Sequence, residues 1–88
     1  MDIPENFKLE TAPNPFNSHC QIKYSMLNNH LSVNIDIFSI NGKIIESYEN
    51  LPSENIINWD ASGNPAGVYL IRLSNGEESF VERIVYMK

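Results

Sequence analysis

The sequence predicts an all-β fold, an immunoglobulin-like β-sandwich of about seven antiparallel strands. Short apolar segments recur at intervals of ~8–12 residues, and turn-forming pairs such as Asn41-Gly42 and Asn75-Gly76 lie between them. No segment has the ~3.6-residue periodicity of an amphipathic helix. A chain of 88 residues forms one domain, which we expect at residues 9–88 after a leader or linker at residues 1–8.

The first two expected strands lie before residue 27. Two apolar residues alternate with two charged ones over residues 7–10, which indicates a weak strand. It ends at residues 13–17, where each proline lacks a backbone donor and so excludes a central strand position. We expect an edge bend there, with Phe16 in the core. The second strand, residues 20–26, alternates cleanly and places four side chains on one face: Cys20, Ile22, Tyr24 and Met26.

The next two strands form a hairpin. After a turn at residues 27–30, alternation over residues 33–40 predicts a half-buried strand, and Asn41-Gly42 reverses the chain into a strand at residues 43–48. Phe38 lies on the polar face of the first of these strands, which indicates either a bulge or a small exposed apolar contact site. A loop follows at residues 49–53.

Three further strands complete the predicted sandwich. Residues 54–60 form a strand whose Trp59 faces inward, and residues 67–74 are apolar on both faces, which favours a central position. Asn75-Gly76 suits a type I′ turn because both residues tolerate positive φ, and the final strand covers residues 79–87. Six residues are expected in the core: Tyr24, Ile35, Ile37, Trp59, Tyr69 and Ile71.

The charge distribution excludes several classes of partner. The net charge of −5 divides into −1 over residues 1–44 and −4 over residues 45–88, so nucleic acid and anionic membranes are poor partners. No apolar run reaches the ~18 residues that a membrane helix needs, so we expect no membrane insertion. The N-terminus is acidic where a signal peptide would be basic, so we expect either a cytoplasmic chain or the tail of a longer exported one.

The sequence contains few groups that could support catalysis. Cys20 and His19 are neighbours on a strand and point to opposite faces, so they cannot form a dyad. His30 could approach from its turn, but the position of Cys20 on the apolar face favours a buried, inert thiol. Two histidines without a cysteine pair or a carboxylate do not make a zinc site. We therefore expect no enzyme activity and no cofactor.

One loop has a spacing that suggests a metal. Asp60, Ser62 and Asn64 offer side-chain oxygens at the first, third and fifth positions, as in a calcium-binding EF-hand. Such a loop then needs glycine and a bidentate glutamate, where this chain has Pro65 and Ile71. The three residues stay a weak calcium candidate, and the simpler interpretation is a turn in which Asp60 and Asn64 bond to the backbone.

Six segments, in order and spacing, resemble the C-terminal sorting domain of the type IX (Por) secretion system. They are residues 13–17 (PNPFN), 22–24 (IKY), 33–38 (VNIDIF) with 41–45 (NGKII), 59–60 (WD), 66–73 (AGVYLIRL) and 83–88 (RIVYMK). The resemblance extends over nearly the whole chain from about Leu9. Single segments occur in many β-proteins, so it is their combination that is specific.

The resemblance implies a non-catalytic signal that directs a cargo through the type IX outer-membrane translocon for secretion or cell-surface attachment. The cargo would precede this domain, pass through the periplasm and be processed by a sortase-like protein. Nine positions match the marked residues of that family and are the expected recognition residues: Pro13, Asn14, Pro15, Gly67, Tyr69, Arg83, Ile84, Val85 and Lys88. The terminal strand, residues 81–87, could dock by adding to a partner's sheet, and edge strands could pair two copies into a homodimer.

Two alternatives of other classes stay open at this point. The immunoglobulin-like domain of the flagellar hook-capping protein shares the Trp-Asp, Gly-x-Tyr and terminal apolar patterns and is a structural module. That family usually has glycine after Trp-Asp, whereas this chain has Ala61. A carbohydrate-binding sandwich appended to an enzyme would need a row of exposed aromatic residues, and only Phe38 is a candidate.

Overall fold

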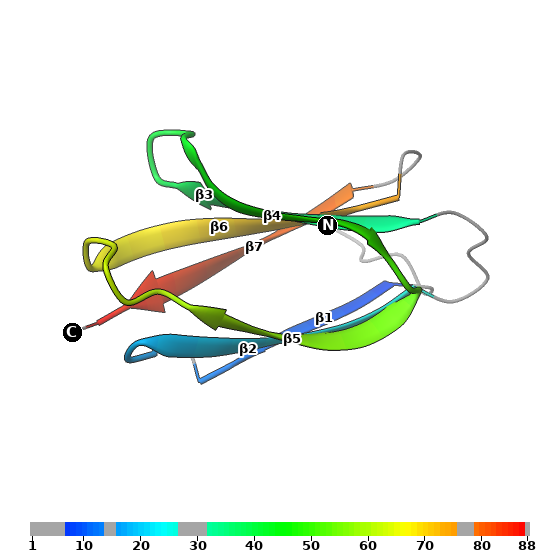
Figure 1. Ribbon diagram of the computed structural model, residues 1–88, viewed down its shortest axis with the longest axis horizontal. Coiled ribbons are helices and arrows are strands. Elements are labelled where there is room, and N and C mark those ends of the chain that lie inside the picture. The colour runs from blue at the N-terminus through cyan, green and yellow to red at the C-terminus, as the bar shows by residue number, and fades with distance from the viewer. Residues whose placement is uncertain (1–6, 14–15, 27–31, 76–78, 88) are drawn as a thin grey trace.

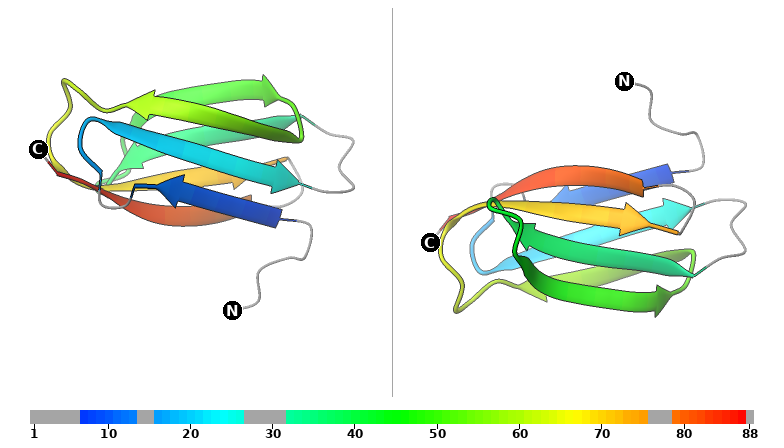
Figure 2. Two further views of the ribbon diagram at one scale, coloured as in Figure 1. Left: turned by 90° about the horizontal axis from the view of Figure 1, so that it is seen from below. Right: turned by 90° about the horizontal axis from the view of Figure 1, so that it is seen from above.

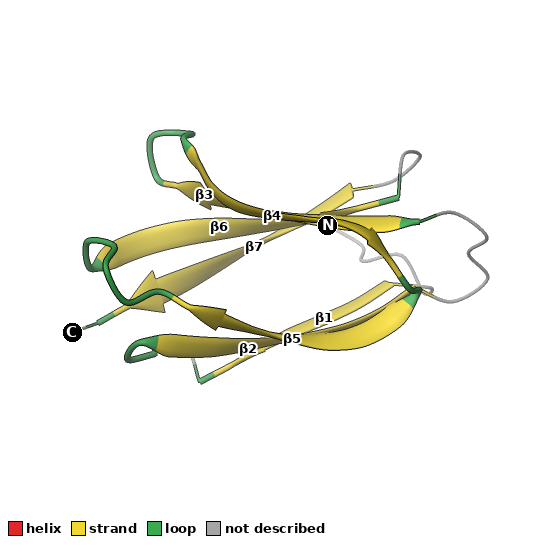
Figure 3. Ribbon diagram, viewed as in Figure 1, coloured by secondary structure: helices red, strands yellow, loops and turns green. Residues whose placement is uncertain are grey.

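The computed structural model describes residues 7–13, 16–26, 32–75 and 79–87, and within these ranges it consists of strands, turns and loops (Figure 3). The strands are β1 (Phe7–Ala12), β2 (His19–Met26), β3 (Val33–Ser39), β4 (Ile44–Leu51), β5 (Glu54–Asp60), β6 (Gly67–Ser74) and β7 (Ser79–Tyr86). Among the described residues, no helix is long and apolar enough to cross a membrane. The predicted all-β class is confirmed.

The strands form two antiparallel sheets that pack face to face (Figure 1). The smaller sheet has the order β1-β2-β5 and the larger has the order β4-β3-β6-β7. In an immunoglobulin constant domain the fourth strand joins the sheet of the first, second and fifth strands. Here β4 pairs with β3, so the fourth strand belongs to the larger sheet.

The core lies between the two sheets and is built by the inward residues of each alternating strand. All six residues expected in the core are at most 4% exposed, including Trp59 at 2%. Among the described residues, the buried hydrophobic cluster consists of Phe16, Cys20, Ile22, Tyr24, Val33, Ile35, Ile37, Ile57, Trp59, Ala61, Tyr69, Ile71, Leu73, Ile84 and Tyr86. The central position predicted for residues 67–74 is also confirmed, because β6 lies between β3 and β7.

The hairpin between β3 and β4 contains the predicted bulge. The Gly42 N–H donates to the Ser39 carbonyl over 2.9 Å, and Gly42 adopts a φ of +91°. Ile37 pairs with Glu46 whereas Phe38 pairs with Ile44, so the register shifts between these two residues of β3. The extra residue of this bulge is Ile45 of β4, opposite the expected bulge position at Phe38. Phe38 itself lies on the outer face because it alternates with the buried Ile35 and Ile37.

β4 continues past the end expected at residue 48. It reaches Leu51, which pairs with Val33, by passing through Asn50 with a φ of +56°. The Asn50 N–H donates to the side-chain oxygen of Asn34 over 3.2 Å. The expected loop over residues 49–53 is therefore shortened to residues 52–53, because a second register shift interrupts the alternation that marks a strand at residues 49–51.

The connection between β6 and β7 is longer than the sequence predicted. Ser74 pairs with Ser79, so residues 75–78 connect the two strands. A two-residue type I′ turn at Asn75-Gly76 would instead pair Ser74 with residue 77, so the expected turn length was wrong. Asn75 is itself buried, at 7% exposed, whereas Gly76 lies outside the described residues.

Several other expectations concern the chain ends and the loops. β1 begins at Phe7, which pairs with Met26, so strand pairing starts two residues before the domain boundary expected at residue 9. The leader at residues 1–6 and the turn at residues 27–30 lie outside the described residues. So do Asn14, Pro15 and Lys88 among the expected recognition positions.

Candidate recognition site

Segments that are far apart in the sequence meet at the C-terminal end of β7. The Phe16 N–H donates to the Val85 carbonyl over 2.9 Å, and the Phe16 carbonyl accepts from the Met87 N–H over 2.8 Å. These bonds form a parallel bridge between Phe16 and Tyr86. Because β1 and β7 lie at the same margin of the sandwich (Figure 2), the connection from β1 to β2 can reach β7 and join the two sheets there.

β6 contributes the other side of this site. Gly67 pairs with Tyr86, and Tyr69 pairs with Ile84. Gly67 has a φ of +146°, which L-residues rarely adopt, and a Cβ added there would have no atom within 4 Å. The backbone conformation, rather than a lack of space, therefore requires glycine at this position.

Four aromatic rings fill the core beneath the site, and we call Phe16, Trp59, Tyr69 and Tyr86 the aromatic cluster. The rings of Phe16 and Tyr86 stack with centroids 5.2 Å apart and planes at 17°. Trp59 meets Phe16 at 5.8 Å and Tyr69 edge-on at 5.4 Å. The Tyr69 hydroxyl donates to the Pro65 carbonyl. Such offset and edge-on pairs add ~0.5–1.5 kcal/mol each beyond the area they bury.

The expected recognition residues divide into exposed and buried groups. Pro13 and Arg83 are exposed, Val85 and Gly67 are half-buried, and Tyr69 and Ile84 are buried in the core. Phe16 and Met87 lie within the segments that carry the family resemblance, residues 13–17 and 83–88, but neither is among the nine expected recognition residues; Met87 is 50% exposed. No local pattern predicts a parallel bridge, so the pairing of Phe16 with β7 could not be read from the sequence.

The structure places Cys20 and His19 on opposite faces of β2, as the sequence predicted. Cys20 is fully buried, and this burial raises the pKa of its thiol to about 11. The His19 Nε2 lies 3.6 Å from the Asp60 carboxylate on the exposed face. No described group of three or more histidine, cysteine, aspartate or glutamate side chains could hold a metal ion. His30 lies outside the described residues.

The loop of the calcium candidate contains the backbone contacts of a turn. The Asp60 carboxylate accepts the Ser62 N–H over 2.9 Å, and hydrogen bonds from Ser62 lower the pKa of this carboxyl. The Asn64 side chain donates to the Ala61 carbonyl over 3.3 Å. These bonds match the simpler interpretation of the loop, and calcium binding stays a prediction.

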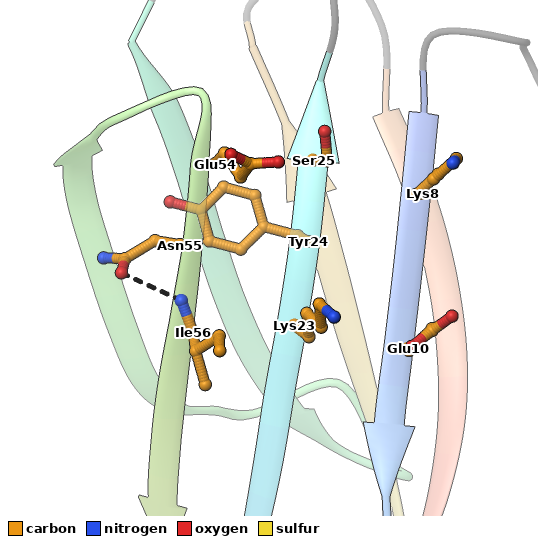
Figure 4. A pocket seen from close by; sticks show the side chains of 8 residues that line it. All are labelled: Lys8, Glu10, Lys23, Tyr24, Ser25, Glu54, Asn55 and Ile56. Carbon is orange, nitrogen blue, oxygen red and sulfur yellow. Dashed lines mark hydrogen bonds between the residues drawn. The ribbon is translucent and has the colours of Figure 1, made fainter.

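A separate open hollow of about 620 Å³ is lined by residues of β1, β2 and β5 (Figure 4). Side chains of both charges line it, with Glu10 directly opposite Lys23 in the strand register. Ligand pockets are usually more enclosed and predominantly apolar. Opposite charges on neighbouring strands also stabilise a solvated sheet face, so we assign no ligand to this hollow.

The fold and the site together describe a small β-sandwich module in which residues before β2 secure the end of the C-terminal strand. The family model of the secretion system C-terminal sorting domain matches residues 11–87. The chain therefore belongs to this family, as its resemblance indicated, and its role is in type IX secretion sorting. Family membership implies interaction with that secretion machinery and a secreted or surface location, and members are sorting modules rather than catalysts.

The chain is also similar to PorZ, a surface component of the type IX secretion system of Porphyromonas gingivalis. The TM-score is 0.70 at 18% sequence identity, over 91% of this chain and 11% of that chain. At this identity the likeness shows the fold alone, and the chain spans about a tenth of the length of that protein. No curated protein matches the sequence.

Proposed function

We propose that this domain is a non-catalytic address that directs a cargo on its N-terminal side through the type IX outer-membrane translocon. The cargo would cross the periplasm first and then be secreted or attached to the cell surface with the help of a sortase-like protein. The observation that supports this proposal is the meeting of Phe16, Gly67, Tyr69 and residues 83–87 at one end of the sandwich.

Only the exposed residues of the site can contact a partner through their side chains. Arg83, Pro13 and Met87 are accessible, whereas the side chains of Tyr69 and Ile84 are buried. In the folded domain, these buried residues can support recognition only by positioning the exposed ones. The predicted recognition set stays the nine residues of the resemblance: Pro13, Asn14, Pro15, Gly67, Tyr69, Arg83, Ile84, Val85 and Lys88.

Strand addition to the last residues of β7 is the less favoured docking mode. The backbone groups of Val85 and Met87 already bond to Phe16, so an added strand would have to displace that residue. Recognition through exposed side chains needs no such displacement. Homodimer formation through edge strands stays a separate prediction.

The other two functions considered for this sequence are not favoured. The family match covers most of the chain, whereas nothing comparable supports a hook-capping module. A carbohydrate-binding face would need exposed aromatic rings, and the exposed large apolar side chains among the described residues are all aliphatic or methionine.

A secretion assay tests the proposal. Residues 1–88 are fused behind a signal-peptide-bearing fluorescent protein and expressed in a type IX-competent bacterium and in a translocon-deficient sister strain. We expect extracellular or surface fluorescence only in the competent strain. Periplasmic retention in both strains, with the domain folded, would reject the sorting function.

A further inference from the structure

The outer face of the larger sheet is unusually apolar for a face that no described strand or loop covers. In β6, Tyr69 and Ile71 point into the core, so Val68 and Leu70 point outward. In β3, Ile35 and Ile37 point into the core, so Phe38 lies on the same outer face. Antiparallel sheets with one solvated face normally alternate apolar-in and polar-out, and this end of the sheet departs from that rule.

The strand register makes these side chains neighbours. Phe38 lies between Ile44 and Leu70, and Leu70 lies beside Arg83, so one row crosses all four strands. The adjacent row pairs Val68 with Val85. We call Phe38, Ile44, Val68, Leu70 and Val85 the apolar patch. It lies on the sheet face seen in the right-hand view of Figure 2 and includes a residue of the C-terminal motif.

The charged residues beside the apolar patch are one ion pair, Arg72 with Asp36, and two further cations, Lys43 and Arg83. Arg72 lies over the Phe38 ring at 4.9 Å and donates to the Asp36 carboxylate over 2.8 Å. The Asp36 side chain is 16% exposed and that of Arg72 is 44% exposed, so the pair carries no net charge and the guanidinium is its more exposed member. Arg83 ends the apolar row, and Lys43 is exposed in the adjoining turn. Glu82, by contrast, is in register with Ile71 and so lies on the inner face.

Area and charge both argue against a second copy of the chain as the partner that covers the apolar patch. Five partly exposed side chains offer on the order of a few hundred Å² of apolar surface, below the ~800 Å² per partner of a standard stable interface. A two-fold dimer through this face would also bring two copies of the same cationic border together. A transient partner with acidic side chains beside an apolar surface fits the patch better.

We infer that the apolar patch, bordered by Lys43, Arg72 and Arg83, is a docking surface for a protein of the type IX secretion machinery that presents acidic groups around an apolar surface. This inference rests on the proposed sorting function and assigns the contact to one sheet face. It predicts that Ile44 and Leu70 matter for secretion although neither belongs to the recognition set defined by the family resemblance.

The test compares a double substitution in the apolar patch with a single control substitution in the fluorescent secretion fusion. Ile44→Thr with Leu70→Thr removes apolar contacts from the patch while keeping strand-forming residues. Ile56→Thr is the control, because Ile56 is 48% exposed on the smaller sheet. Secretion of the patch variant should fall about tenfold, as expected when central apolar contacts leave an interface. The control should be secreted like the wild type, and both purified variants should keep a cooperative melt.

Charge reversal provides a second, independent variant. Arg83→Glu should reduce secretion, whereas Lys23→Glu on the smaller sheet should not. Secretion of folded Ile44→Thr/Leu70→Thr at the wild-type level would overturn the docking surface while leaving the sorting function intact. Failure of the wild-type fusion itself would instead reject the sorting function. A stable dimer in sedimentation that this double variant abolishes would overturn the inference in favour of a second copy.

Discussion

Phe16 and Tyr86 are joined twice, by a parallel backbone bridge and by ring stacking at 5.2 Å. Phe16 belongs to the connection within the smaller sheet, and Tyr86 ends the last strand of the larger sheet. The contact therefore holds the C-terminal motif, residues 83–88, against the rest of the fold at the outer edge of β7. It explains how a terminal segment can present a defined surface instead of a fraying strand end.

The bridge predicts a specific effect of Phe16→Ala. Loss of a buried aromatic side chain should lower the free energy of unfolding by ~3–5 kcal/mol. Local opening at the end of β7 should also increase, because ring packing no longer holds the Phe16 carbonyl against the Met87 N–H. Amide hydrogen exchange of Met87 should accelerate more than that of Ile71 in the centre of the sheet. Equal acceleration at both sites would mean that Phe16 stabilises the whole fold and not this end in particular.

Trp59 should be among the most costly residues to truncate. It is 2% exposed and contacts two other rings of the aromatic cluster, so Trp59→Ala should cost ~3–5 kcal/mol in urea unfolding. Ile56→Ala, three residues away on the exposed face of the same strand, is the matched control and should cost far less. A loss below about 1 kcal/mol for Trp59→Ala would contradict its central place in the core.

Arg83 should separate recognition from stability. Its side chain is exposed on β7, and exposed ionic contacts contribute at most ~1 kcal/mol. Arg83→Ala should therefore leave the melt nearly unchanged and reduce secretion of the fused cargo, and we expect the same of Lys88→Ala. Lys23→Ala, an exposed cation on the smaller sheet, serves as the control and should affect neither property. Unchanged secretion of Arg83→Ala would remove this residue from the recognition set.

Cys20 should be chemically inert until the domain unfolds. With a pKa of about 11, only about a thousandth of the thiol is ionised at pH 8, and the thiolate is the reactive form. Ellman's reagent should react slowly with the folded protein and rapidly in urea. Fast reaction without denaturant would show that the thiol is accessible.

The same pKa predicts how stability depends on alkaline pH. The pKa of the Cys20 thiol is raised from 9.0 to about 11 on folding, so the folded state holds this proton more tightly. The stabilisation is complete below pH 9 and is lost as the pH rises toward 11. Burial raises the pKa of Tyr24 and Tyr69 in the same direction. Above pH 9, the free energy of unfolding of Cys20→Ala should therefore fall less steeply with pH than that of the wild type. An equal fall in both proteins would contradict the raised pKa of the Cys20 thiol.

The alternation of apolar and polar residues determined the all-β class, the approximate strand positions and the inward faces. Trp59, Ile35 and Tyr24 could be assigned to the core from their strands alone, because the two-residue period of a strand is a local property. Residues 13–17 and 83–88 were singled out by the family resemblance, and the match over residues 11–87 confirmed that resemblance. Their role in recognition stays a prediction.

The hairpin of β3 and β4 could be predicted from Asn41-Gly42, but only the tertiary structure decided which strands that are not neighbours in the chain pair with each other. The pairing of β2 with β5, the pairing of β3 with β6 and the bridge from Phe16 to Tyr86 depend on contacts between residues distant in the chain. The apolar patch likewise exists because the strand register brings Phe38 beside both Ile44 and Leu70. A sequence specifies the period of each strand, but register and sheet order are set by long-range packing, which no local pattern records.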